Sequence, residues 1–196
     1  MNTKAIAVRR TTSLQALMTK DLPKYLSADE VRRVIEQTKS PRDRLLMELL
    51  WQTGARISEC LALTPSHIDF NGSVLKTPTL KRRKQMVRPI PLKPGLLGEL
   101  ARHVAAKKVG EHETLFGIRR TRAFQIIQRA CLTAGIERSR SHPHVFRHSF
   151  AITCVIQGVP VPVLNQWLGH AGLESTMIYS KVLAVDSRQF HDRMAF

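Results

Sequence analysis

Apolar residues recur every three or four positions along several stretches of the chain, a spacing typical of helices with one buried face. The first stretch follows Ser27, and Glu30 three residues later completes a capping box. The second opens with Pro41, a residue favoured in the first helical turn, and ends at Gly54. Their apolar positions are Val31, Val34 and Ile35 in the first stretch and Leu45, Leu46, Leu49 and Leu50 in the second. The pattern therefore predicts two successive helices that each bury one face.

The helical spacing continues towards the C-terminus, but residues 73–92 interrupt it. There the segments VLKTPT and MVRPIPL are extended, contain prolines and are separated by LKRRKQ, which predicts a β-hairpin with a basic tip. The other predicted helices cover residues 57–63, 121–134, 144–158, 162–168, 175–179 and 185–196, and one more begins at Pro94. We therefore expect a mainly α fold with one small antiparallel β-hairpin or sheet, an α+β arrangement.

The length of 196 residues fits one principal domain, which we assign to residues 23–184. Residues 1–22 form a basic N-terminal arm, which either contacts phosphates or a partner or is a frayed terminus. We expect residues 185–196 to form a C-terminal helix with Phe190, Met194 and Phe196 as apolar positions. This helix packs either on its own domain or on a neighbouring protomer.

The charge of the chain is strongly unbalanced. Thirty-one Lys and Arg residues against 15 Asp and Glu residues give a net charge of +16. This favours a protein that binds a polyanion such as nucleic acid over a ribosome-like or merely basic protein.

The three cysteines lie far apart and form no disulfide framework, which is typical of a reducing compartment. The sequence has no apolar run long enough for a membrane span and no signal peptide, so we expect a cytoplasmic protein.

Two arginines have unusual surroundings. The sequence lacks the nucleotide-binding motif GxxxxGK[ST], and it has no carboxylate cluster of the kind that holds two metal ions. Chemistry on a phosphodiester would therefore need positively charged side chains in place of metal ions. Arg56 follows the predicted helix end at Gly54, and Arg147 lies within an otherwise apolar helix. The planar guanidinium group matches phosphate oxygens and keeps its charge. The alternative is a structural salt bridge, for example between Arg56 and Glu59.

Histidines and one tyrosine complete a candidate site. His144 precedes Arg147 by three positions, so one helical face presents both, and Tyr179 follows His170 by nine positions. A phenol can attack phosphorus if a base takes its proton and cations offset the charge. The other tyrosine, Tyr25, looks like a packing residue. His144 and His148 could also form a metal pair, but no further ligand lies at a suitable spacing.

Four short motifs, in the same order as in that family, make the chain resemble the tyrosine recombinases (phage integrase-like family). They are TGARISECLAL, HPHVFRHSFA, LGH and TMIYS, and the interval from Arg147 to His170 is 23 positions. The resemblance covers roughly residues 22–180 and implies a catalytic domain that cleaves and rejoins DNA through a 3′-phosphotyrosyl intermediate. Cofactor, metal and ATP are not needed, because phosphoryl transfer depends mainly on positioning and charge stabilisation.

The resemblance also implies roles for individual residues. Arg56, Arg147 and His170 would hold the non-bridging oxygens of the scissile phosphate, His144 would assist proton transfer, and Tyr179 would be the nucleophile. A hairpin lysine would protonate the leaving 5′-hydroxyl; we choose Lys81 by position over its neighbours Lys76 and Lys84. Glu59 would support the site without reacting.

The same resemblance implies double-stranded DNA as partner, a tetramer on paired DNA sites, and a nucleoid-associated protein of bacterial, plasmid or phage origin. Many members carry a further N-terminal domain that clamps DNA, whereas about two dozen residues precede the predicted domain here. The chain is then either a fragment or a short member. Two other functions stay open: a DNA-relaxing enzyme like the type IB topoisomerases, and a catalytically silent DNA-binding regulator with the same fold.

Overall fold

Ser27 and Ser40 begin the first two helices, as the sequence predicts. The computed structural model describes residues 23–78 and 87–183. In helix α2 (Ala28–Glu36), the Ser27 hydroxyl accepts from the Glu30 amide at 3.2 Å, and the Glu30 carboxylate accepts from the Ser27 amide at 2.9 Å. Helix α3 (Pro41–Thr53) has Pro41 in its first turn and ends at Gly54, which adopts a left-handed φ of 62°. Both predicted helices are thereby confirmed.

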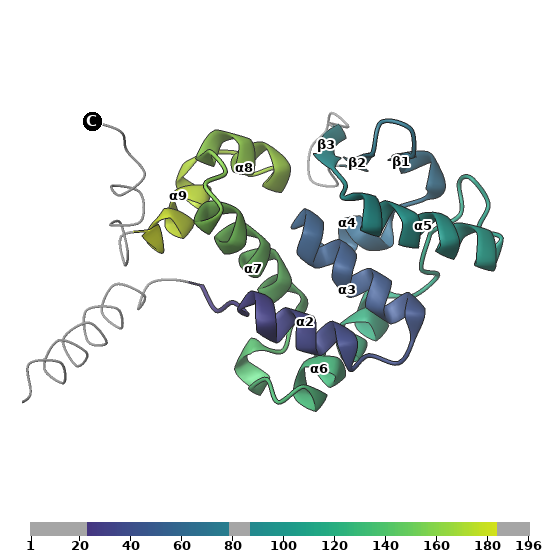
Figure 1. The fold of residues 1–196 in the computed structure, drawn as a ribbon, viewed down its shortest axis with the longest axis horizontal. Helices are drawn as coiled ribbons and strands as arrows, with labels where there is room; N and C mark the ends of the chain where they lie inside the picture. Colours follow the sequence, from purple (N-terminus) through teal and green to yellow (C-terminus); the bar gives the residue numbers. More distant parts are fainter. Residues whose placement is uncertain (1–22, 79–86, 184–196) are drawn as a thin grey trace, which may run out of the picture.

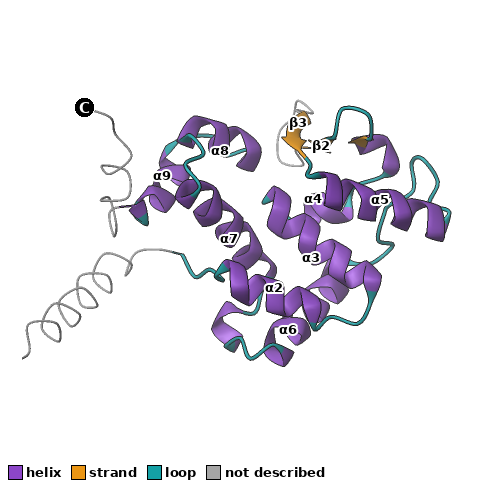
Figure 2. Ribbon diagram, viewed as in Figure 1, coloured by secondary structure: helices purple, strands orange, loops and turns teal. Residues whose placement is uncertain are grey.

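The remaining helices follow the predicted pattern with small shifts at their ends (Figures 1 and 2). They are α4 (Ile57–Leu61), α5 (Pro94–Lys107), α6 (Arg120–Thr133), α7 (Pro143–Ile156), α8 (Val161–Leu168) and α9 (Glu174–Ser180). Two 3₁₀ turns, η1 (Pro65–His67) and η2 (Arg138–Arg140), were not predicted. Helix α4 ends two residues before the predicted position: Ala62 caps it, and the Leu63 amide donates to the Cys60 carbonyl in a tighter turn. Thr64, which precedes Pro65, is extended with ψ of 166°. The predicted helix at 185–196 lies outside the described residues.

The predicted hairpin forms two strands of a small antiparallel sheet. Strand β2 (Val74–Pro78) pairs with β3 (Val87–Pro91), and Leu75 lies opposite Ile90 while Thr77 lies opposite Arg88. A third strand, β1 (Ile68–Asp69), pairs with β2 and was not predicted, because two residues are too short to show an alternating pattern. The tip at 79–86 carries Lys81 and Lys84 and lies outside the described residues.

Helix α7 joins two apolar cores. The larger core surrounds α3 and contains Leu46, Leu50 and Phe146, while the smaller one contains Leu164, Leu168 and Tyr179. Figure 1 shows α8 and α9 at one end of α7, with α3 beside it and the sheet beyond α3. Tyr25 packs against the smaller core, as predicted for a packing residue. The ends of α3 and α8 are thereby both held against α7, where the candidate site lies.

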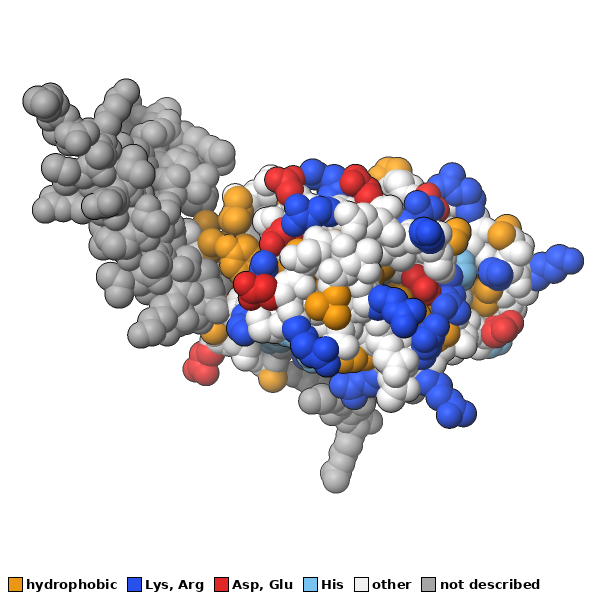
Figure 3. Space-filling model, turned by 90° about the horizontal axis from the view of Figure 1, so that it is seen from below, with side chains coloured by type: hydrophobic (Ala, Val, Ile, Leu, Met, Phe, Trp, Pro, Cys, Tyr) orange, Lys and Arg blue, Asp and Glu red, His pale blue; other side chains and the backbone are white. Residues whose placement is uncertain are grey.

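The surface of the described residues is rich in positive charge. In the view from below in Figure 3, Lys and Arg side chains are spread more widely than Asp and Glu side chains. Within the same residues, no helix is long and apolar enough to cross a membrane. The three cysteines are buried and free, in agreement with the absence of a disulfide framework.

Candidate active site

The junction between α3 and α4 positions Arg56. The backbone amide of Arg56 donates to one oxygen of Glu59 at 2.8 Å, and its guanidinium donates to the other at 2.9 Å. The Glu59 side chain is 2% exposed, whereas that of Arg56 is 28% exposed. The salt bridge that the sequence allows is therefore present, and it leaves part of the guanidinium open to a ligand.

Arg147 projects from α7 into the interior and binds two backbone carbonyl oxygens. It donates to Gly54 at 2.6 Å and to Leu168 at 2.8 Å, so it links the ends of α3 and α8. Burial, together with Arg56, lowers the pKa of Arg147 to about 10, which leaves the group charged at neutral pH. A guanidinium has five N–H groups and each carbonyl takes one, so three N–H groups of Arg147 have no acceptor among the described residues and remain for a ligand.

A third arginine, Arg88 on β3, belongs to the same cluster and was missed by the sequence analysis. It donates to Glu59 at 2.7 Å and to the carbonyl oxygen of Leu168. The Glu59 carboxylate therefore lies between Arg56 and Arg88, and the Leu168 carbonyl between Arg88 and Arg147. The signal was available in the strand pattern, because Arg88 occupies the same face as the buried Ile90.

His170 follows α8 directly after Gly169. Its Nδ1 lies 2.9 Å from the hydroxyl of Thr176, which donates to the side-chain oxygen of Asn165 at 2.7 Å. Because the Thr176 hydrogen is used in that bond, His170 donates from Nδ1 and keeps Nε2 for other partners. Burial lowers the pKa of His170 to about 4, and Arg147 and Arg56 act in the same direction. The ring is therefore neutral near pH 7 in the absence of an anion.

Tyr179 on α9 is buried, and its hydroxyl lies 2.9 Å from Nδ1 of His148. Burial raises the pKa of Tyr179, and the nearby Arg147 opposes that shift. Burial also lowers the pKa of His148 to about 4, with smaller contributions from His144 and Arg147. A phenol thus meets a neutral imidazole beside a buried cation. The sequence pattern had indicated His148 only as half of a metal pair.

His144 lies in the first turn of α7, with its ring centroid 6.4 Å from that of His148. Burial lowers the pKa of His144, followed by Arg147 and His142, and then by Arg120 and Arg56. No group of three His, Cys, Asp or Glu side chains suited to a metal ion occurs in the part of the chain that the structure describes.

The structure brings Arg56, His144, Arg147, His170 and Tyr179 into one neighbourhood. Hydrogen bonds join Arg147 to Gly54 and Leu168, the residues that flank the segments carrying Arg56 and His170. Arg147 also acts electrostatically on His144, His170 and Tyr179. The predicted general acid Lys81 lies outside the described residues.

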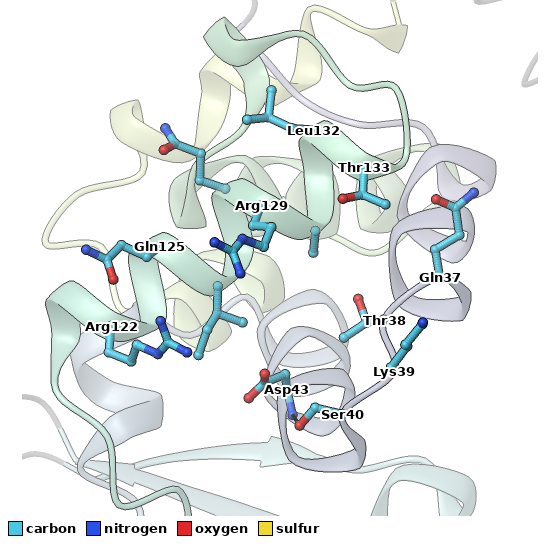
Figure 4. A pocket seen from close by; sticks show the side chains of 13 residues that line it. Gln37, Thr38, Lys39, Ser40, Asp43, Arg122, Gln125, Arg129, Leu132 and Thr133 are labelled. Atoms are coloured by element: carbon cyan, nitrogen blue, oxygen red, sulfur yellow. Dashed lines mark hydrogen bonds between the residues drawn. The ribbon is translucent and has the colours of Figure 1, made fainter.

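A separate polar groove lies between the α2–α3 connection and α6 (Figure 4). Lys39, Arg122 and Arg129 contribute positive charge to it, Asp43 contributes negative charge, and the rest is mostly amide and hydroxyl groups. The predicted site residues do not line this groove, so it adds to the basic surface and not to the site.

Fold and site together define the class of protein: the chain belongs to the phage integrase family, whose sequence model matches residues 24–184. Among individual relatives, the chain is 31% identical over 178 residues to tyrosine recombinase XerA of Pyrococcus horikoshii, covering 87% of this chain and 61% of that protein. It is 30% identical to a resolvase of Escherichia coli, covering 95% of this chain and 83% of that protein.

Solved structures of recombinases share this fold. The crystal structure of XerA recombinase matches 89% of this chain and 65% of its own, with a TM-score of 0.71 and 25% identity. The XerH site-specific recombinase bound to its difH substrate matches 81% of this chain and 50% of its own, with a TM-score of 0.70 and 23% identity. The predicted fold, mainly α with a small antiparallel sheet, is confirmed. The chain spans about three fifths of the length of the XerA relative.

Proposed function

We propose that the chain is the catalytic domain of a site-specific DNA recombinase that cleaves and rejoins DNA through Tyr179, without metal or ATP. The observation that carries the proposal is the hydrogen bond between the Tyr179 hydroxyl and a neutral His148, next to two arginines and His170 that converge from α4, α7 and the end of α8. A nucleophile, a proton acceptor and fixed cations are the parts that attack on a phosphodiester requires.

Arg56, Arg147 and His170 hold the non-bridging oxygens of the scissile phosphate. Arg56 offers its exposed edge, and Arg147 offers the N–H groups that its two carbonyl partners leave free. The phosphate charge favours protonation of His170, whose Nε2 then donates to an oxygen while Nδ1 stays bound to Thr176. Three donors from three segments therefore fix one phosphate.

Tyr179 attacks phosphorus as its proton passes to His148, and the bond from phosphorus to the 5′-oxygen breaks. The 5′-oxygen takes a proton from a general acid, a role for which Lys81 is proposed from the family resemblance. The geometry favours His148 over His144 as the group that accepts the proton, because the phenol contacts His148 directly. His144 lies one helical turn away from His148. His144 assists proton transfer through that neighbouring ring. In the reverse reaction, a 5′-hydroxyl attacks the phosphotyrosine, so rejoining needs no external energy.

Double-stranded DNA is the proposed partner. The net charge of +16 supports it, as does the basic start of α6, where Arg120 is close enough to the site to act on the pKa of His144. The related XerH was solved bound to its difH substrate. Strand exchange between two sites requires two pairs of nucleophiles, so we propose a tetramer on paired sites, in the cytoplasm at the nucleoid.

Covalent capture tests the proposal and does not require that the target sequence in the DNA be identified first. The probe is a library of duplexes with randomised sequence around a fixed nick, so that cleavage beside the nick releases a short fragment and traps the protein on the DNA. We expect adducts that survive denaturation, a common sequence among them, and none with Tyr179→Phe, which keeps DNA binding. Adducts formed equally by Tyr179→Phe, or none from a protein that binds the library, would refute the proposal. Exchange between two captured sites on one plasmid, rather than relaxation alone, distinguishes a recombinase from a topoisomerase.

A further inference from the structure

We infer that Arg88 is a positioning residue that holds Arg56, Arg147 and the His170 segment in a single arrangement; the inference rests on the proposed function of that site. Arg88 is 5% exposed and lies beneath these residues, so its contacts are with protein groups and not with DNA. Its partners come from α4 and from the end of α8, two elements that carry or adjoin phosphate-binding groups.

The first link runs through Glu59. One oxygen of this carboxylate accepts from the backbone of Arg56 and from Arg88 at 2.7 Å, and the other accepts from the Arg56 side chain. Because two cations share it, the carboxylate cannot follow Arg56 if that side chain moves. Arg88 therefore fixes the anchor on which the orientation of Arg56 depends.

The second link runs through the carbonyl oxygen of Leu168, which accepts from both Arg88 and Arg147. Leu168 is the last residue of α8, and His170 follows two positions later. The Arg88 side chain packs so closely on Gly169 that a Cβ added there would lie 2.1 Å from its Nη1 and 2.5 Å from its Cδ. The turn that presents His170 is therefore built against this guanidinium.

The third link runs through the sheet. Arg88 lies opposite Thr77 in the register of β2 and β3, and both side chains are buried. Among the described residues, neither Nε of Arg88 nor the Thr77 hydroxyl has a hydrogen-bond partner, so Glu59 and Leu168 alone orient the guanidinium. The strand that follows the basic hairpin tip is thus tied to the site through one side chain.

The rate at which Arg88→Met forms the covalent adduct tests the inference. The substrate is the DNA sequence that the parent protein selects from the library. Loss of the hydrogen bonds to Glu59 and to the Leu168 carbonyl displaces the phosphate-binding groups, so the single-turnover rate should fall about 100-fold, with DNA affinity changed less than about threefold. Arg88→Lys supplies charge without the planar fork and should recover only part of the rate. The matched control is Arg102→Met, which removes an exposed arginine paired with Glu99.

A substrate with a methyl group in place of one non-bridging oxygen separates positioning from misfolding. Such a phosphonate carries less negative charge, so its cleavage depends less on how the cations are arranged. We expect the deficit of Arg88→Met to shrink to about tenfold or less on this substrate, following the weaker charge interaction. An equal deficit on both substrates, or the parent rate in Arg88→Met on the phosphate, would overturn the inference.

Amide hydrogen exchange tests the links without DNA. The amides of Gly169 and His170 donate to the carbonyl of Asn165, and both should exchange at least about tenfold faster in Arg88→Met, whereas amides of α2 should not change. Unchanged exchange at Gly169 and His170 would contradict the inference even if the parent forms adducts. Faster exchange with no adducts from the parent would instead refute the proposed function and leave the link intact.

Discussion

The phenolic oxygen of Tyr179 lies 2.9 Å from Nδ1 of His148, a residue 31 positions earlier in the chain. The contact joins α9 to the middle of α7 and places the proposed nucleophile inside the smaller core rather than on the surface. In the proposed mechanism, attack on a phosphate begins from a phenol that is already hydrogen-bonded to a neutral base. This arrangement makes His148 the residue whose loss is most informative about proton transfer.

His148→Asn should lower the rate of adduct formation about 100-fold, because the amide replaces the ring at the position of Nδ1 but cannot take up a proton. DNA affinity should be unaffected, since His148 faces Tyr179. The measurement is the single-turnover rate of adduct formation on captured DNA, with the exposed His112→Asn as control. If His148→Asn reacts at the parent rate, another group accepts the proton.

Acid should destabilise the protein over the range where unfolded histidines bind protons and the buried ones do not. Burial lowers the pKa of both His148 and His170 from 6.5 to about 4 in the folded state. The stability that the neutral rings contribute is complete above 6.5 and is lost as the pH falls towards 4. Each proton taken up on unfolding adds a slope of at most about 1.4 kcal/mol per pH unit.

Urea denaturation at a series of pH values between 7 and 4 measures this slope. The double variant His148→Asn/His170→Asn should show a clearly smaller loss of unfolding free energy over that range than the parent does. An unchanged slope would mean that both rings take up protons in the folded protein over the same pH range as in the unfolded chain.

Two glycines with similar backbone angles should differ in their tolerance of a side chain. Gly54 and Gly158 have φ of 62° and 79°, so alanine at either position costs about 1–2 kcal/mol for the left-handed backbone. At Gly54 the added Cβ would also lie 2.3 Å from the Phe150 ring, whereas at Gly158 it meets no atom within 4 Å. Gly54→Ala should therefore lower the free energy of unfolding more, as thermal denaturation can measure. Equal losses would argue against close packing of α3 on α7.

DNA affinity should fall as the pH rises, because the bound phosphate is expected to raise the pKa of His170 from its value of about 4 in the free protein. Linkage limits the change to about tenfold in the dissociation constant per pH unit and per proton. Fluorescence anisotropy with captured DNA at pH 5.5 to 8 measures it. His170→Asn should flatten the dependence; an identical dependence in that variant would assign the proton elsewhere.

Short sequence motifs were enough to predict the framework of the fold and most of the residues that the structure brings together at the candidate site. Ser27, Pro41 and Gly54 mark helix ends through the hydrogen bonds and backbone angles of one turn, so the sequence carries that information locally. The sequence also singled out the residues on α4, α7 and α9 that the fold brings together. The strand β1 was missed because two residues carry no period.

The strand pattern can place Arg88 on the buried face of β3, but the partners of Arg88 and of Tyr179 could not be predicted from the sequence in the same way. Arg88 bonds to Glu59 and Leu168, which are 29 and 80 positions away, so its role exists only once β3 packs against α4 and α8. In the sequence it is one of many basic residues. The helical period placed His144 and Arg147 on one face, but which ring meets the phenol depends on how α9 packs on α7.

The carbonyl of Leu168 affects the electrostatic potential of the site in a way that a count of charged side chains would not show. Two guanidinium groups converge on this neutral oxygen at the negative end of the α8 dipole. Glu59 is the single carboxylate among their hydrogen-bond acceptors within the described residues. A site neutralised by several acids would attract a phosphodiester much less. Here the main chain supplies much of the counterbalance, and the surplus positive potential stays available to an incoming anion.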